Sequence, residues 1–146
     1  MNRTTTVKEG SIERKWFVVD AAGIPVGRLA GQVAQVLRGK NKTNFAYNAD
    51  CGDFVIVINA AQAVLTGNKA DEIVYWHSGW PDGLKNVSRG KMLADDPVKT
   101  IERAVWGMTP KTKLGNQIIK KLKVYAGSEH PHEAQNPTPL DVRKTK

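Results

Sequence analysis

The chain has 146 residues, a formal charge of +8 and one cysteine, and 40% of its residues are hydrophobic. This size and composition predict one globular domain, residues 1–146, rather than a disordered basic chain. The longest apolar run, Phe54–Ile58, is far too short to span a bilayer, and the first fifteen residues lack the apolar centre of a secretory signal. A lone Cys51 forms no internal disulfide, so we expect a reducing, cytoplasmic compartment.

The positive charge is concentrated in two windows that contain no acidic residue, 21–49 and 103–128. The rest of the chain is slightly acidic. The basic residues of the two windows are Arg28, Arg38, Lys40 and Lys42, then Arg103, Lys111, Lys113, Lys120, Lys121 and Lys123. Concentrated positive charge favours a polyphosphate partner, because each phosphate that is neutralised releases a condensed counterion. An anionic lipid surface is the weaker alternative, since the helix predicted in the first window turns its apolar side to the core.

The N-terminal half predicts a strand, a helix and a second strand. Residues 16–20 are aromatic and β-branched and precede a turn at 21–23, which is typical of a strand. Pro25 suits the start of a helix, apolar residues then recur at three- and four-residue steps, and Gly39 ends the pattern. Phe54–Ile58 is apolar at every position, as in a strand covered on both faces. This order predicts a right-handed βαβ unit and an α/β fold.

Residues 40–53 and 73–83 carry local sequence signals of a loop and of a strand followed by a turn. The basic connection 40–53 is long for a crossover, and long ordered loops tend to be functional. Residues 73–78 predict a strand and 80–83 a turn. We expect Trp76, His77 and Trp80 in this region to pack in the core rather than to stack on bases.

In the C-terminal half, Asp95-Asp96-Pro97 predicts a helix start with a side-chain cap, and Gly107 predicts its end. A short helix is expected over 116–121, with Lys120, Lys121 and Lys123 on its exposed side. From about residue 129 the prolines indicate an extended tail, and residues 1–13 are expected to be flexible.

Catalytic and metal-binding readings find little support. The segment Gly23–Gly27 lies between a strand and a helix but lacks the spacing of a dinucleotide or phosphate-binding loop, so close helix packing is the better role for Gly27 and Gly31. His130-Pro131-His132 lacks the further ligands of a structural zinc, and Cys51 has no general base nearby in the sequence. We therefore expect no catalytic residue, no metal and no cofactor.

Several blocks in order resemble a universal large-subunit ribosomal protein family, number thirteen in the bacterial naming. They are Trp16–Ala21, Gly27–Ala30, Gly52–Asp53, Asn59–Ala60, Thr66–Lys69, Gly107–Gly127 and Glu129–His130, and the resemblance spans roughly residues 14–139. It implies a three-layer α/β/α sandwich around a small, mostly parallel sheet, and binding to large-subunit ribosomal RNA early in assembly. Two positions depart from the family pattern. Trp106 stands where Lys or Arg is usual and Thr109 where an aliphatic residue is usual, so one phosphate contact is replaced by stacking or lost.

The prediction is a non-catalytic structural protein of the large ribosomal subunit that binds ribosomal RNA through two basic surfaces. The residues expected to contact RNA are Arg28, Arg38, Lys40, Lys42, Asn44, Lys69, Lys111, Lys113, Asn116, Lys120, Lys121 and Lys123. The expected partners are large-subunit ribosomal RNA and neighbouring ribosomal proteins, with no membrane and no small-molecule substrate. The alternatives are a small-nucleotide-binding enzyme and an RNA-binding regulator outside the ribosome.

Overall fold

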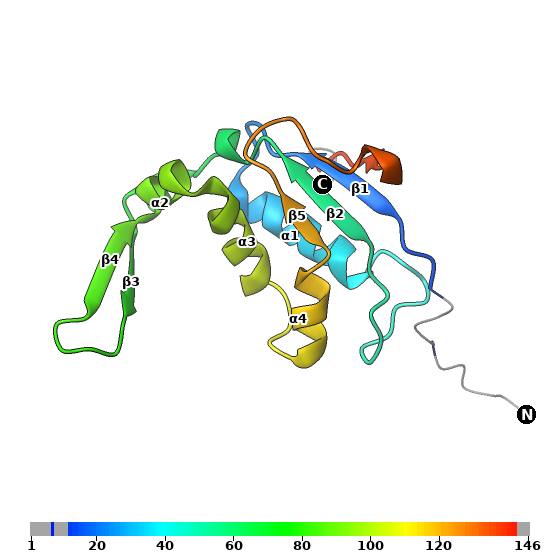
Figure 1. Cartoon of the computed structure of the whole chain (residues 1–146), viewed down its shortest axis with the longest axis horizontal. Coiled ribbons are helices and arrows are strands. Elements are labelled where there is room, and N and C mark those ends of the chain that lie inside the picture. Colours follow the sequence, from blue (N-terminus) through cyan, green and yellow to red (C-terminus); the bar gives the residue numbers. More distant parts are fainter. Residues whose placement is uncertain (1–6, 8–11, 143–146) are drawn as a thin grey trace, which may run out of the picture.

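The computed structural model describes residue 7 and residues 12–142, so most of the segment 1–13, expected to be flexible, lies outside the described residues. The chain folds around a four-stranded sheet with helices packed against it (Figure 1). The main elements are β1 (Trp16–Asp20), α1 (Val26–Arg38), β2 (Phe54–Ile58), β3 (Ile73–His77), β4 (Leu84–Ser88), α2 (Arg89–Asp95), α3 (Pro97–Gly107), α4 (Lys113–Ile119), β5 (Leu122–Val124) and β6 (Thr138–Pro139). Single turns of 3-10 helix lie at η2 (Ala60–Gln62), η3 (Gly67–Ala70) and η4 (Glu133–Gln135).

The sheet confirms the predicted α/β class. Its strand order is β5-β2-β1-β6 and every neighbouring pair is parallel. Trp16 pairs with Phe54 and Asp20 with Ile58, so β1 and β2 run in register along their whole lengths. Parallel strands of this kind need a crossover between them, and α1 supplies it. The predicted strand–helix–strand unit is therefore present with nearly the expected limits.

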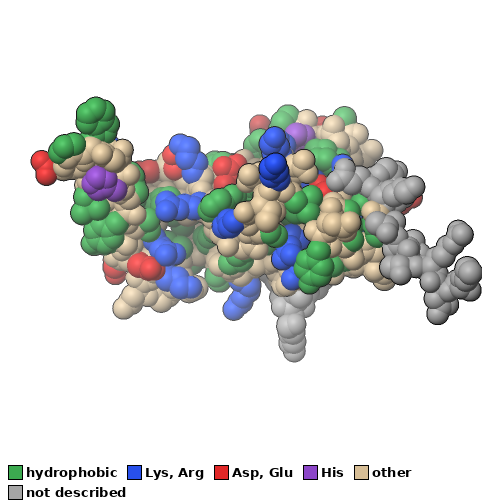
Figure 2. Space-filling view, turned by 90° about the horizontal axis from the view of Figure 1, so that it is seen from below, with side chains coloured by type: hydrophobic (Ala, Val, Ile, Leu, Met, Phe, Trp, Pro, Cys, Tyr) green, Lys and Arg blue, Asp and Glu red, His purple; other side chains and the backbone are tan. Residues whose placement is uncertain are grey.

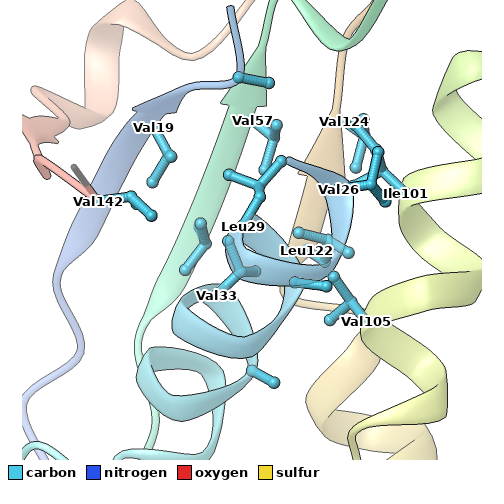
Figure 3. Packing of buried hydrophobic residues seen from close by; sticks show 14 of the residues in the cluster. Val19, Val26, Leu29, Val33, Val57, Ile101, Val105, Leu122, Val124 and Val142 are labelled. Carbon is cyan, nitrogen blue, oxygen red and sulfur yellow. The ribbon is translucent and has the colours of Figure 1, made fainter. Parts of the chain in front are cut away.

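One face of the sheet is covered by helices. Alternation along the strands turns Val55 and Val57 of β2 and Leu122 and Val124 of β5 to the same face, and all four belong to the buried cluster. Figure 3 shows α1 placing Leu29 and Val33 against this face, with Ile101 and Val105 of α3 closing its side. The residues predicted to form the apolar side of α1 are thus the ones that the structure buries.

The opposite face of the sheet is covered by the C-terminal segment. This segment takes the place of the third layer of the predicted sandwich, and it contains only a single helical turn. Trp16 stacks on Phe54 with ring centroids 4.3 Å apart, and the His132 ring lies 5.2 Å from Trp16. His132 also forms a hydrogen bond with the hydroxyl of Tyr125 at 2.8 Å. The histidines of the tail therefore pack with aromatic side chains, and no group of three metal-ligating side chains occurs among the described residues.

The C-terminal segment, expected to be an extended tail, adds a two-residue strand to the sheet. Strand β6 adds to the free edge of β1, where Thr138 Oγ1 donates a hydrogen bond to the Trp16 carbonyl and the Leu140 amide donates to the Val18 carbonyl. Val142 is buried in the core cluster. The sequence did not predict this strand, because prolines occur in edge strands as well as in extended tails.

Residues 73–88 form an antiparallel hairpin, β3 and β4, that stands apart from the main sheet at one end of the molecule (Figure 1). The prediction that Trp76, His77 and Trp80 pack in the core is wrong, because all three are exposed, Trp80 by 77%. The residue pattern predicted β3 but gave no signal for β4 or α2. Local patterns predict strands without saying which body of the protein they pack against.

The second predicted C-terminal helix begins and ends earlier than expected. Helix α4 covers Lys113–Ile119, and the Thr112 hydroxyl caps it by accepting a hydrogen bond from the Gly115 amide at 3.3 Å. The chain then enters β5, which the sequence analysis did not predict. At the start of α3, the Asp96 side chain does not cap the helix but holds Lys99 at 2.7 Å. No helix in the described part of the chain is long and apolar enough to cross a membrane.

Candidate nucleic-acid interface

Three adjoining hollows run along the start of α1, past α3 and onto β5. The first lies at the start of α1 and is lined by Arg28 and Lys69. The second shares Val26 and Leu65 with the first, and includes Arg89 and Arg103. The third shares Arg103 with the second and includes Lys99, Lys120 and Lys123. We call the surface formed by these three hollows the cationic groove. Its seven basic lining residues are Arg28, Lys69, Arg89, Lys99, Arg103, Lys120 and Lys123.

The cationic groove contains one acidic lining residue, Glu102. Two of its cations are held by acids beside it: Arg89 by Glu72 at 3.1 Å and Lys99 by Asp96 at 2.7 Å. The hydrogen bond that the Lys99 ammonium donates to Asp96 raises the pKa of Lys99, so this exposed ammonium stays charged. Figure 2 shows Lys and Arg side chains gathered on the face between the hairpin and the body of the protein. The groove is therefore a site of positive charge built from separate segments.

Four of the predicted residues lie in this groove: Arg28, Lys69, Lys120 and Lys123. They come from both acid-free windows and, in the case of Lys69, from outside them. The fold thus brings Arg28 of the first window and Lys120 and Lys123 of the second window to the same groove. The two basic surfaces expected from the sequence therefore do not correspond to one window each.

Arg89, Lys99 and Arg103 line the cationic groove but were not among the residues expected to contact RNA. The signal for two of them was present, because Lys99 and Arg103 are four residues apart and lie on one side of α3. Arg89 could not be found in this way, since it belongs to the helix that the sequence analysis missed.

A second basic region lies at the other end of α1. Here a hollow joins Arg38 and the loop residues Phe45 and Tyr47 to Thr112 and Leu114 of the α4 segment. Lys40, Asn44, Lys113 and Asn116 are exposed on the same loop and helix. We call these five residues, Arg38, Lys40, Asn44, Lys113 and Asn116, the α4 end. Like the cationic groove, the α4 end combines residues of both acid-free windows.

Lys111 is exposed but its ammonium is already engaged. It lies 3.3 Å from the centroid of the Trp106 ring and donates a hydrogen bond to the Trp106 carbonyl at the end of α3. Both contacts favour the cation, through the ring quadrupole and through the negative end of the helix dipole. Trp106 therefore holds the neighbouring Lys111 in place through both its ring and its carbonyl.

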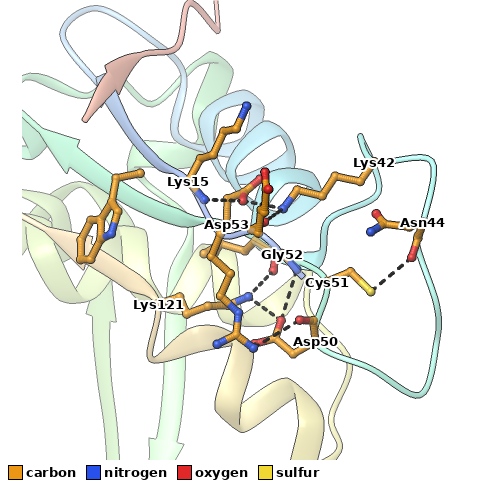
Figure 4. A network of polar contacts seen from close by, with 12 residues as sticks. Lys15, Lys42, Asn44, Asp50, Cys51, Gly52, Asp53 and Lys121 are labelled. Atoms are coloured by element: carbon orange, nitrogen blue, oxygen red, sulfur yellow. Dashed lines mark hydrogen bonds and ion pairs between the residues drawn. The ribbon is translucent and has the colours of Figure 1, made fainter. Parts of the chain in front are cut away.

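Lys121 does not lie on the surface, contrary to the expectation from the sequence. Only 5% of the residue is exposed, and its ammonium forms an ion pair with Asp50 and donates to the Leu37 carbonyl at 3.1 Å (Figure 4). The reason is that it directly precedes β5, where the chain turns into the sheet, so it does not share the helix face of Lys120. Burial lowers the pKa of Lys121, although the hydrogen bond and the charge of Asp50 oppose this shift. Its position leaves no surface for a phosphate.

Lys42 is likewise paired inside the loop 40–53. Its Nζ lies 2.6 Å from the Asp53 carboxylate and 2.8 Å from the Glu13 carbonyl, which accepts a hydrogen bond from it. Asp53 also accepts a hydrogen bond from the Lys15 amide at 2.8 Å. Acids that follow the first window in the sequence therefore neutralise Lys42 and Lys121, and the two pairs fix the long loop against α1 and β1.

The glycines at the start of α1 and the single cysteine were the remaining candidates for a functional role. A Cβ on Gly27 would meet nothing within 4 Å, and one on Gly31 would make only an ordinary contact with Met108, so the expected close packing at Gly27 and Gly31 is wrong. Cys51 is buried, with its Sγ 3.5 Å from the Asn44 carbonyl. Neither position brings together the groups of a catalytic site.

Comparison with known proteins gives a consistent result. The family model described as Ribosomal protein L13 matches residues 14–131. The chain is 54% identical to "Large ribosomal subunit protein uL13" of Cutibacterium acnes over 140 residues, 95% of each chain. Proteins of the same name from Lactobacillus acidophilus and a Nocardioides species are 52% and 51% identical, over 99% and 97% of both chains.

These matches cover nearly the whole chain and agree with the order of blocks found in the sequence. They also agree with the expectation that the protein is not an enzyme, because the family is one of structural ribosomal proteins. The chain belongs to the ribosomal protein L13 family, in its bacterial form.

Proposed function

We propose that this protein is a structural constituent of the cytoplasmic large ribosomal subunit and binds large-subunit ribosomal RNA early in subunit assembly. The observation that carries the proposal is the cationic groove, in which seven basic residues from separate segments line three adjoining hollows. Membership of the L13 family supports the same reading. The α4 end would provide a second contact, and neighbouring ribosomal proteins would cover other parts of the surface.

The groove suits the sugar–phosphate backbone better than the base edges. Lys and Arg side chains supply charge and donors for phosphate oxygens, and these contacts position the RNA without reading its sequence. The major groove of A-form RNA is too narrow for side chains, so a rigid α/β body with fixed cations recognises folded RNA through its shape. The paired Lys42 and the buried Lys121 contribute to this rigidity and not to the contact itself.

The dependence of binding on salt tests the proposal. The protein and its Lys120→Ala/Lys123→Ala variant would be titrated onto a transcript of bacterial large-subunit ribosomal RNA at several KCl concentrations. Each lost phosphate contact should flatten the slope of log K against log salt by roughly 0.7 to 0.9. The matched control is Lys120→Arg/Lys123→Arg, which keeps both charges and should keep the slope. If the alanine variant has the same slope as the unchanged protein, Lys120 and Lys123 do not contact RNA phosphates.

A further inference from the structure

The hairpin has two faces of different chemistry. Because side chains alternate along a strand, Val74 and Trp76 of β3 share one face with their cross-strand partners Val87 and Lys85. We call this the Trp76 face. The other face is made by residues without a formal charge at neutral pH: Ile73, Tyr75, His77, Leu84, Asn86 and Ser88.

The Trp76 face continues the cationic groove. Val74 lines the groove together with Arg89 and Arg103, and Trp76 lies two residues farther along the same face. Lys85 is the residue directly opposite Trp76. The acid at the base of the hairpin, Glu72, is paired with Arg89 at 3.1 Å. Lys85 itself forms no ion pair with any residue in the described part of the chain.

The ring of Trp76 is available to a ligand. The residue is 44% exposed, and its ring stacks on no other ring and carries no cation among the described residues. Trp106 differs in this respect, because the Lys111 ammonium already lies over its ring. An isolated two-stranded hairpin is only marginally stable in water. An aromatic ring left exposed beside the cationic groove, as that of Trp76 is, therefore indicates a face that the ligand of the groove covers.

We propose that Trp76 stacks on an unpaired base of ribosomal RNA while Lys85 neutralises an adjoining phosphate, which extends the cationic groove onto the hairpin. The inference rests on the proposed function. Aromatic platforms beside a positively charged groove are how proteins hold single-stranded segments, and unstacked bases in loops and bulges are what folded RNA offers to such a platform. The continuity with the groove and the presence of Lys85 favour RNA on this face over a protein partner.

The test compares substitutions on the two faces of the same hairpin, using the large-subunit ribosomal RNA transcript as the probe. Trp76→Leu keeps an apolar side chain but removes the ring, and Trp76→Phe keeps a ring. We expect Trp76→Leu to weaken binding by about 5- to 150-fold, the range measured for loss of one stacked base, and Trp76→Phe to restore most of the affinity. Tyr75→Leu, on the opposite face, should bind within about twofold of the unchanged protein.

The salt dependence separates stacking from charge. Trp76→Leu should leave the slope of log K against log salt unchanged, whereas Lys85→Ala should flatten it by roughly 0.7. Circular dichroism would confirm that each variant is folded. The inference is overturned if Trp76→Leu binds like the unchanged protein, if Tyr75→Leu weakens binding as much, or if Trp76→Leu impairs only incorporation into subunits, which would indicate a protein partner. Failure of the unchanged protein to prefer this transcript over transfer RNA would instead overturn the proposed function.

Discussion

The ammonium of Lys121 and the carboxylate of Asp50 form an ion pair in the protein interior, although 71 residues separate them in the chain. Arg14 lies 3.8 Å from the same carboxylate, and the Leu37 carbonyl accepts a second hydrogen bond from Lys121. The pair joins the end of the loop 40–53 to the start of β5. It is thus a link within the fold, next to a lysine that faces solvent.

The neighbouring lysines should therefore respond differently to substitution. Lys121→Ala leaves the buried Asp50 carboxylate with only the more distant Arg14 as its ion-pair partner. The substitution should lower the free energy of unfolding by about 3–5 kcal/mol, because the desolvation cost of a buried charge is no longer offset by its main partner. Lys120→Ala, at an exposed position, should cost less than about 0.5 kcal/mol. Urea denaturation measures both values. Equal losses at the two positions would contradict the assignment.

The buried position of Lys121 also predicts a pH dependence. Because burial lowers its pKa in the folded state below the 10.5 of an exposed lysine, the unfolded chain binds more protons in the interval between the two values. The contribution of this residue to stability should then increase as the pH rises through that interval. The stability of the unchanged protein, measured relative to Lys121→Met, should accordingly grow between neutral pH and pH 10.5. A difference that stays constant or shrinks with rising pH would show that the pKa is not lowered.

Gly52 should tolerate no side chain. A Cβ at this position would lie 1.7 Å from the Leu37 carbonyl oxygen, which is backbone and cannot move without displacing the end of α1. Gly52→Ala should therefore destabilise the fold by more than the 1–3 kcal/mol typical of overpacking, measured as a lower Tm. Gly27→Ala is the matched control, since its Cβ would meet nothing within 4 Å. A normal Tm for Gly52→Ala would refute the close approach.

The C-terminal segment should contribute to stability. A chain ending at residue 136 loses the β6 hydrogen bonds to β1 and the burial of Val142, which alone is worth about 1.5–3 kcal/mol. Such a chain should unfold at a lower urea concentration than the full chain. A chain ending at residue 142 keeps these contacts and should unfold at a higher urea concentration than the chain ending at residue 136. Equal stability of these two chains would mean that the segment does not close the sheet.

Sequence patterns predicted the parts of the fold in which one local signal decides the structure. The apolar side of α1 and the continuous apolar run of β2 each record burial directly in their residue spacing. Strands β5 and β6 were missed because they are short and join the sheet only through pairing with distant strands, which no local window contains. The exposed aromatics of the hairpin were misread for the same reason, since composition does not reveal that the hairpin leaves the body.

The candidate site was predicted in part. The concentration of charge in two windows identified Arg28, Lys120 and Lys123, which the structure places in one groove. It also led to Lys121, whose partner Asp50 lies just beyond the first window, so an acid-free stretch of sequence was not an acid-free surface. The distribution of charge along a chain therefore predicts which class of partner the protein binds. The fold decides which cationic side chains are accessible to that partner.

The most direct test of the account is lysine footprinting of the protein alone and bound to large-subunit ribosomal RNA. With an amine-acetylating reagent and mass spectrometry, Lys120 and Lys123 should react in the free protein and be protected in the complex, whereas Lys121 should stay unreactive in both. Lys120 and Lys123 that remain fully reactive in a saturated complex would contradict the proposal that the cationic groove binds the RNA.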